Sequence, residues 1–163
     1  MLLPGDQAPS FSILKPREKA SRYAAGAGGK PSLVIFIETD CPTCRLTIPY
    51  INRLAEAVDE SFANILAVSQ DDELATKNLV DEMSMNFPVV IDRDLGISRL
   101  FDPQTVPTIF LLDSQGRITQ VEAGFDKAAI NSVAAKLAGD AGLEAVVIAH
   151  QFDGAPQFKP GCS

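Results

Sequence analysis

The chain has 163 residues, of which 46% are hydrophobic and 21% are charged, a balance that indicates one globular domain and excludes a disordered chain. The net charge is −7 and lysine and arginine form no run, so nucleic acid is not expected as a partner. No apolar stretch is long enough to span a membrane, and the first residues lack the pattern of a signal peptide. The sequence as written therefore predicts a cytoplasmic protein, with a periplasmic or membrane-tethered one as the alternative if a leader has been removed.

The predicted elements begin after a region rich in Gly, Pro, Ala and Ser over residues 1–30, in which AAGAGGKPS indicates a flexible turn. SLVIFIE, at 32–38, is a nearly continuous apolar run that predicts a strand buried on both faces. A helical pattern follows it, with Ile51, Leu54 and Val58 on one face.

Strands and helices then alternate along the chain. Strands are predicted at 63–69, 87–92, 108–113 and 117–124, and helices at 71–85, 95–101 and 126–139. SQG joins the last two strands in a tight hairpin turn, and Gly139 is expected to cap the last helix. This order predicts an α/β fold with a central mixed β-sheet flanked by helices on both faces. We divide it into an N-terminal extension (1–30), a core (31–138) and a C-terminal tail (139–163) whose structure the pattern does not define.

Cys41 and Cys44 stand where the first buried strand meets the following helix. The unpaired N–H groups and the positive dipole end of a helix start stabilise a thiolate on Cys41, and Cys44 one turn later can attack a mixed disulfide formed there. The pair therefore predicts a dithiol that exchanges electrons with a substrate disulfide, without a metal or an organic cofactor. Asp40 would raise the pKa of Cys41, whereas Arg45 would lower it.

Several motifs resemble proteins of the thioredoxin fold. These motifs are the CxxC at a strand-to-helix junction, Pro49 within the same helix, and TVPT before a buried strand. The opening GDQAPSFSIL is similar to the redoxin (AhpC/TSA) branch, and AVSQDDE, MNFPVVIDRD and VPTIFLLDSQGRI are similar to TlpA/ResA-type thiol–disulfide oxidoreductases. The resemblance covers residues 4 to 138 and implies a thioredoxin-like fold with a helix and strand inserted over 70–91.

The resemblance also implies a substrate groove and partners. The family carries a cis-proline at the position of Pro107, beside the dithiol, and Val106 would offer backbone groups to an extended substrate segment. Pro42 and Thr43, between the two cysteines, would complete the groove. The implied partners are protein disulfides or dithiols and an upstream reductant or oxidant, whereas the direction of electron flow and the oligomeric state follow from neither residues nor family.

Three residues depart from the family pattern. Thioredoxins carry a Trp before the first cysteine, where Asp40 stands here, and a buried acid where Ile35 stands. Many TlpA/ResA-type proteins have a Glu at the position of Thr47. Proton transfer to Cys44 would then use water, or Glu38 if its side chain points inward.

Two alternative functions are considered. A thiol-dependent peroxidase needs Thr or Ser three residues before its cysteine and Pro seven before, but Cys41 is preceded there by Glu38 and Val34. The other is a non-catalytic module that binds a protein, or binds zinc through the two cysteines with Cys162 and His150.

Cys162, one residue from the end, has two interpretations. It is an exposed thiol on a mobile terminus, or the tail folds back so that Cys162 becomes an extra redox thiol that exchanges with Cys41.

Overall fold

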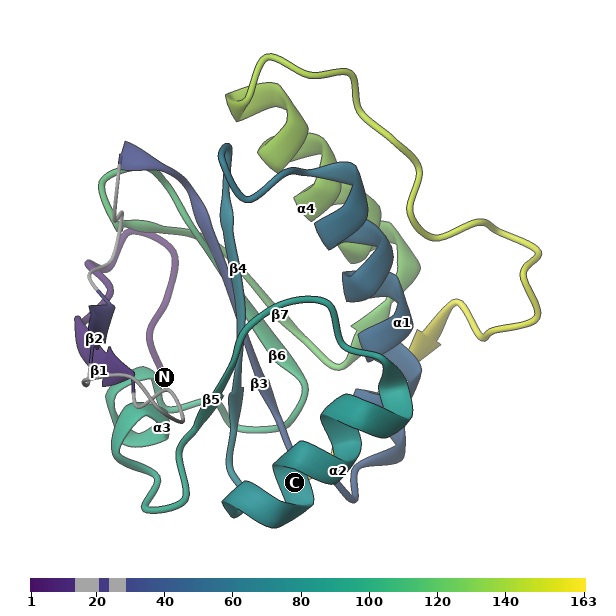
Figure 1. The fold of residues 1–163 in the computed structure, drawn as a ribbon. Helices are drawn as coiled ribbons and strands as arrows, with labels where there is room; N and C mark the ends of the chain where they lie inside the picture. Colours follow the sequence, from purple (N-terminus) through teal and green to yellow (C-terminus); the bar gives the residue numbers. More distant parts are fainter. Residues whose placement is uncertain (14–20, 24–28) are drawn as a thin grey trace.

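The computed structural model describes residues 1–13, 21–23 and 29–163; most of the expected AAGAGGKPS turn lies outside these residues. The chain forms strands and helices in the order β1 (Phe11–Ile13), β2 (Ser21–Tyr23), β3 (Ser32–Ile37), α1 (Pro42–Ala57), β4 (Asn64–Ser69), α2 (Glu73–Met83), β5 (Val89–Ile91), α3 (Gly96–Phe101), β6 (Thr108–Leu112), β7 (Ile118–Ala123), β8 (Phe125–Asp126), α4 (Lys127–Asp140) and β9 (Phe158–Lys159) (Figure 1). The alternation predicted from the sequence is confirmed.

The central sheet has five strands in the order β5-β4-β3-β6-β7. Strands β3, β4 and β5 are parallel, whereas β6 and β7 run antiparallel as a hairpin closed at Asp113 and Arg117. All six residues of β3 are buried, because this central strand is covered on both faces; its apolar run is therefore continuous rather than alternating. The expected mixed sheet is confirmed.

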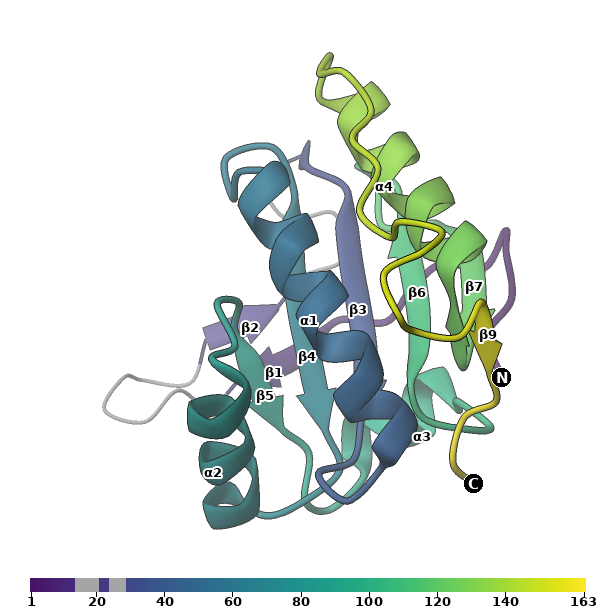
Figure 2. The same cartoon turned by 90° about the vertical axis from the view of Figure 1, so that its right-hand side faces the viewer.

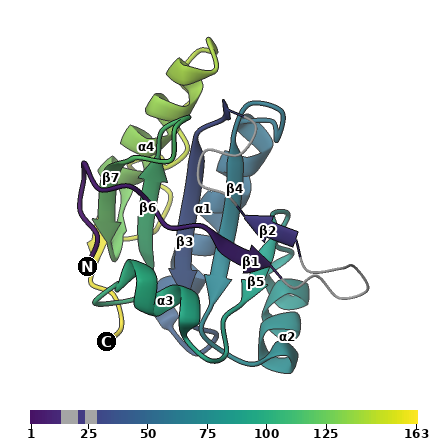
Figure 3. The ribbon, with the colours of Figure 1, turned by 90° about the vertical axis from the view of Figure 1, so that its left-hand side faces the viewer.

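Helices cover both faces of this sheet. α1 and α4 lie side by side on one face, with α2 beside α1 (Figure 2). α3 and the N-terminal strands β1 and β2 lie on the opposite face (Figure 3). Phe36 of β3 and Phe110 of β6 contact Phe101 of α3 with ring centroids 5.2 and 5.1 Å apart, which fixes α3 to the sheet. The inserted helix and strand expected over 70–91 are α2 and β5.

The C-terminal tail returns across the molecule. α4 continues past Gly139 to Asp140, and Gly142 adopts φ +71°, so the expected cap at Gly139 is wrong by a few residues. From there the chain runs back along α1 and α4 to β9, which pairs with β8, and continues to the C-terminus (Figure 2). Within the described residues, no helix is long and apolar enough to cross a membrane.

Candidate active site

Cys41 occupies the N-cap of α1, directly after β3 and its short loop. Its Sγ accepts a hydrogen bond from the Cys44 backbone N–H at 3.2 Å, and Pro42 takes the first helical position, where no N–H is needed. The side chain is buried, and Sγ also lies 3.4 Å from the Val106 carbonyl oxygen. The sulfur therefore lies at the helix start, the position that the sequence predicts for it.

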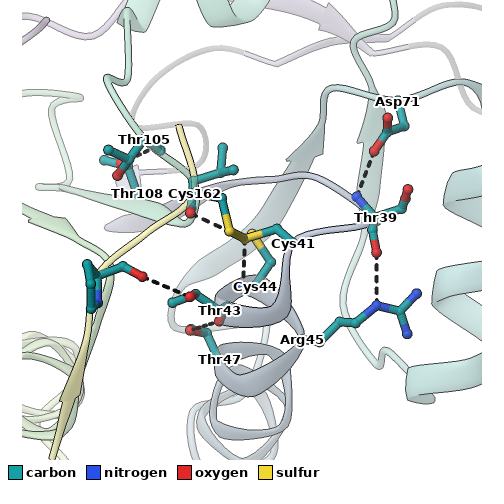
Figure 4. Close-up of a disulfide and its surroundings, with 12 residues drawn as sticks. Thr39, Cys41, Thr43, Cys44, Arg45, Thr47, Asp71, Thr105, Thr108 and Cys162 are labelled. Atoms are coloured by element: carbon teal, nitrogen blue, oxygen red, sulfur yellow. Dashed lines mark hydrogen bonds between the residues drawn. A yellow bond between two sulfur atoms is a disulfide. The ribbon is translucent and has the colours of Figure 1, made fainter.

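Cys41 is joined by a disulfide to Cys162, with the two Cα atoms 6.1 Å apart (Figure 4). Cys44 is a free, buried thiol beside it. The interpretation of Cys162 as an exposed tail thiol of no consequence is therefore wrong. The tail folds back, and the sequence contains 120 residues between the two linked positions, which is why spacing alone could not reveal the pair.

Cys44 is fully buried, and its environment opposes ionisation. Burial is the largest cause that raises the pKa of the Cys44 thiol to about 12; the charges of Glu38 and Asp71 also raise it, and a hydrogen bond with the Glu38 backbone lowers it. Burial, followed by Asp71 and Asp40, also raises the pKa of Glu38. Glu38, suggested as a proton carrier, thus lies close enough to act electrostatically on Cys44.

Val106 and Pro107 lie opposite Cys41, and the peptide bond between them is cis, in agreement with the expectation. Val106 N–H donates to the Cys162 carbonyl at 2.9 Å, and Cys162 N–H donates to the Val106 carbonyl at 2.7 Å. On the α1 side, Thr43 Oγ1 donates to the Pro160 carbonyl at 2.8 Å. Two of the four residues expected to form a groove, Val106 and Thr43, therefore bond to one extended segment, and this segment is the protein's own tail.

Arg45 and Asp40, the other two residues expected to tune the cysteines, are placed differently from Glu38. Arg45 donates from Nε to the Thr39 carbonyl at 2.9 Å and pairs with Glu82, so its guanidinium turns away from the sulfurs (Figure 4). Asp40 is exposed. Thr47 donates its hydroxyl to the Thr43 carbonyl at 2.8 Å within the helix. The tuning expected from Arg45 is therefore not supported by its position.

The four residues of the zinc alternative do not form a site. His150 is exposed on the loop after α4. In the part of the chain that the structure describes, no group of three or more Cys, His, Asp or Glu side chains is arranged to hold a metal ion. The three cysteines instead form one disulfide, between Cys41 and Cys162, and one free thiol, Cys44.

Sequence reasoning missed two glycines beside the site. A Cβ on Gly161 would lie 2.6 Å from Thr105 Oγ1 and 2.7 Å from the Val106 carbonyl oxygen. A Cβ on Gly124 would lie 2.8 Å from the Lys159 carbonyl oxygen. The only available signal was the PGC sequence at the end of the chain, where glycine directly precedes a cysteine.

The chain is similar to known proteins. The sequence profile of the AhpC/TSA family matches residues 4–121. The thiol-disulfide oxidoreductase ResA of Halalkalibacterium halodurans is 31% identical over 121 residues, which are 74% of this chain and 68% of that protein.

Two solved structures share the fold. The thiol:disulfide interchange protein DsbE from Chlorobium tepidum has a TM-score of 0.77 at 21% identity and covers 86% of this chain and 99% of its own. A protein from Geobacillus kaustophilus has a TM-score of 0.74 at 17% identity and covers 99% of this chain and 91% of its own, so its likeness extends into the tail. With the profile and the ResA relative matching most of its length, the chain belongs to the AhpC/TSA family, as a thiol–disulfide oxidoreductase of the ResA-like group.

Proposed function

We propose that Cys41 is the nucleophile and Cys44 the resolving thiol of this oxidoreductase. The Cys41 thiolate attacks one sulfur of a protein disulfide, and the other substrate sulfur leaves as a thiolate that takes up a proton. Cys44 then loses its proton and attacks Cys41 Sγ, which releases the second substrate thiol and leaves a Cys41–Cys44 disulfide. Two electrons have then passed from the pair to the substrate, and the reverse sequence oxidises a dithiol.

The position of Cys41 Sγ carries this proposal. It lies at the start of α1, accepts the Cys44 N–H, and faces Val106 across the groove. Cys44 is enclosed, and its raised pKa keeps it protonated at neutral pH, so it is a poor first nucleophile. The division of roles between the two thiols therefore follows from their surroundings.

The proposed partner is an extended protein segment that carries a cysteine. Val106 offers one N–H and one carbonyl to such a segment, and Thr43 offers a hydroxyl from the other side. The two sulfurs carry both electrons, so the proposal includes no metal and no organic cofactor. An upstream reductant or oxidant restores the starting state.

We also propose that the protein works outside the cytoplasm, since the TlpA/ResA-type proteins that it resembles generally do so. Fractionation of the native cell, followed by detection of the chain, tests this. Recovery in the cytosolic fraction alone would contradict this proposal and support the cytoplasmic location predicted from the sequence as written.

Reduction of insulin by dithiothreitol, with catalytic amounts of the protein, tests the assignment of roles. We expect Cys41→Ser to abolish the acceleration. The reduced Cys44→Ser, Cys162→Ser double variant, mixed with insulin in the absence of dithiothreitol, should accumulate a covalent adduct through Cys41. Full activity of Cys41→Ser would contradict the proposal. Turnover of hydrogen peroxide with the same thiol at a higher rate than insulin reduction would favour the peroxidase instead.

A further inference from the structure

The last six residues, 158–163, which we call the C-terminal segment, lie inside the proposed substrate groove. Its two strand residues pair antiparallel with β8, and Cys162 pairs antiparallel with Val106 through two backbone hydrogen bonds of 2.9 and 2.7 Å. Thr43 holds the Pro160 carbonyl from the helix side. The segment therefore satisfies the same groups that an external substrate would use, and it places a cysteine sulfur on Cys41.

The fit of the segment depends on a lack of side-chain atoms where the two backbones meet. Gly161 leaves no room for a Cβ, which would lie within 2.7 Å of the Val106 carbonyl oxygen, a backbone atom that cannot rotate away. Gly124, at φ +79°, lies in the core beside the segment, and a Cβ there would lie 2.8 Å from the Lys159 carbonyl oxygen. The close approach of the two backbones explains Gly161, whereas Gly124 is favoured both by its positive φ and by the approach of Lys159.

The chain before the segment is fixed by buried polar contacts. Lys127, at 2% exposure, donates from Nζ to Asp153 at 2.6 Å and to the His150 carbonyl at 2.8 Å. The Tyr50 hydroxyl donates to the same carboxylate from α1. The Asn131 side chain, on α4, accepts hydrogen bonds from the backbone N–H groups of Ile148 and Ala149 and donates one to the Ala149 carbonyl, each at 2.9 Å. At Asp153, nine residues before Cys162, the path of the tail is therefore already set toward the groove.

We propose that the C-terminal segment is a built-in substrate of the enzyme and that Cys162 is its third redox thiol; this rests on the proposed function. In the oxidised resting state Cys41 is linked to Cys162, and Cys44 is a thiol. When Cys44 loses its proton and attacks Cys41 Sγ, the Cys41–Cys44 bond forms, the Cys41–Cys162 bond breaks, and Cys162 leaves as a thiolate that is then protonated. No electrons enter or leave in this step, so the enzyme exchanges one internal disulfide for the other and frees its groove.

The docked segment also specifies the external substrate. A protein substrate competes with a tethered segment whose effective concentration is on the order of millimolar. A cysteine that follows a glycine, in an extended stretch, fits the path past Val106 and Thr105 without a clash. The preferred substrate class is therefore a protein or peptide with an exposed Gly-Cys sequence, and other disulfides are weaker substrates.

Disulfide mapping of the oxidised full-length protein tests the internal exchange. After alkylation of free thiols in acid, mass spectrometry should find Cys41 linked to Cys162 and the alkyl group on Cys44. Gly161→Ala should shift the linkage to Cys41–Cys44, whereas Gly139→Ala, which adds the same methyl group in open space on α4, should not. Only Cys41–Cys44 in the wild-type protein would overturn the proposal.

Peptide capture gives a second test that does not depend on the tail. In the Cys44→Ser, Cys162→Ser double variant, a peptide of sequence QFKPGCS should form a mixed disulfide with Cys41 roughly tenfold more favourably than QFKPACS. Equal capture of the two peptides would overturn the glycine preference. Insulin reduction by the wild-type protein separates this from the proposed function: equal peptide capture by an active protein would overturn the glycine preference alone, whereas a wild-type protein without activity would overturn the function itself.

Discussion

At the residue scale, two thiols three positions apart have opposite surroundings. Cys41 receives a backbone N–H at the start of α1 and contacts the groove, whereas Cys44 is enclosed by the helix and the sheet, with the negative charges of Glu38 and Asp71 nearby. Burial is the largest cause of the raised pKa of Cys44. The step that Cys44 performs is therefore limited by its ionisation.

The second step of the reaction should be steeply pH-dependent. With a pKa of about 12, the thiolate fraction of Cys44 increases about tenfold for each pH unit across the neutral range. In Cys162→Ser, one equivalent of an aromatic disulfide should release its coloured thiolate in two phases, and the second phase should accelerate about tenfold per unit from pH 6 to 9. The Cys44→Ser, Cys162→Ser double variant should lack this phase. A rate that levels off near pH 7 would show that Cys44 ionises more easily than its burial indicates.

Thr43 and Thr47 provide a matched pair for testing how the tail is held. Both are buried, but the Thr43 hydroxyl bonds to Pro160 of the tail and the Thr47 hydroxyl to the backbone of its own helix. A hydrogen bond contributes about 1 kcal/mol, so Thr43→Val should shift the oxidised protein about fivefold from the Cys41–Cys162 form toward the Cys41–Cys44 form. Thr47→Val should leave that ratio unchanged when both are measured by thiol mapping. An equal shift in both variants would assign the effect to α1 itself.

At the element scale, local pattern predicts the sheet and helices but not the tail. β3 and β4 are apolar runs, and the face of α1 recurs at helical spacing, so each is readable within its own residues. The tail is placed by contacts with Thr43, Val106 and Lys127, which are far away in the sequence. The burial of Lys127 in particular depends on a carboxylate 26 residues further on, and no pattern around either residue indicates it.

The loop that carries the tail should weaken in acid. Hydrogen bonds from Lys127 and then Tyr50 lower the pKa of Asp153 below its ordinary value. A carboxyl group whose folded pKa is lowered contributes stability above its unfolded pKa, about 3.9, and loses it as the pH falls through the folded pKa. Asp153→Asn should therefore lower the melting temperature at pH 7, and the difference from wild type should shrink below pH 4. A difference that stays constant down to pH 2 would contradict a role for the charge.

At the scale of the whole molecule, the Cys41–Cys162 link joins the central helix to the end of the chain and encloses most of the fold. The sequence places each cysteine correctly in its element or terminus, but which two of the three pair depends on how β8, β9 and α4 bring the tail back. This closure has a thermodynamic consequence, because a disulfide restricts the unfolded chain more when its loop is longer.

The two internal disulfides should therefore differ in how much they stabilise the protein. With a separation of 121 residues, the Cys41–Cys162 loop contributes ~5 kcal/mol in the chain-entropy account, whereas the three-residue separation of Cys41 and Cys44 contributes ~2 kcal/mol. Urea unfolding of oxidised wild type should accordingly give a free energy of unfolding about 3 kcal/mol above that of oxidised Cys162→Ser. The two proteins should converge when dithiothreitol is added, since neither loop then exists. If the gap persists under reducing conditions, Cys162 stabilises the fold by packing, and the closed loop contributes nothing.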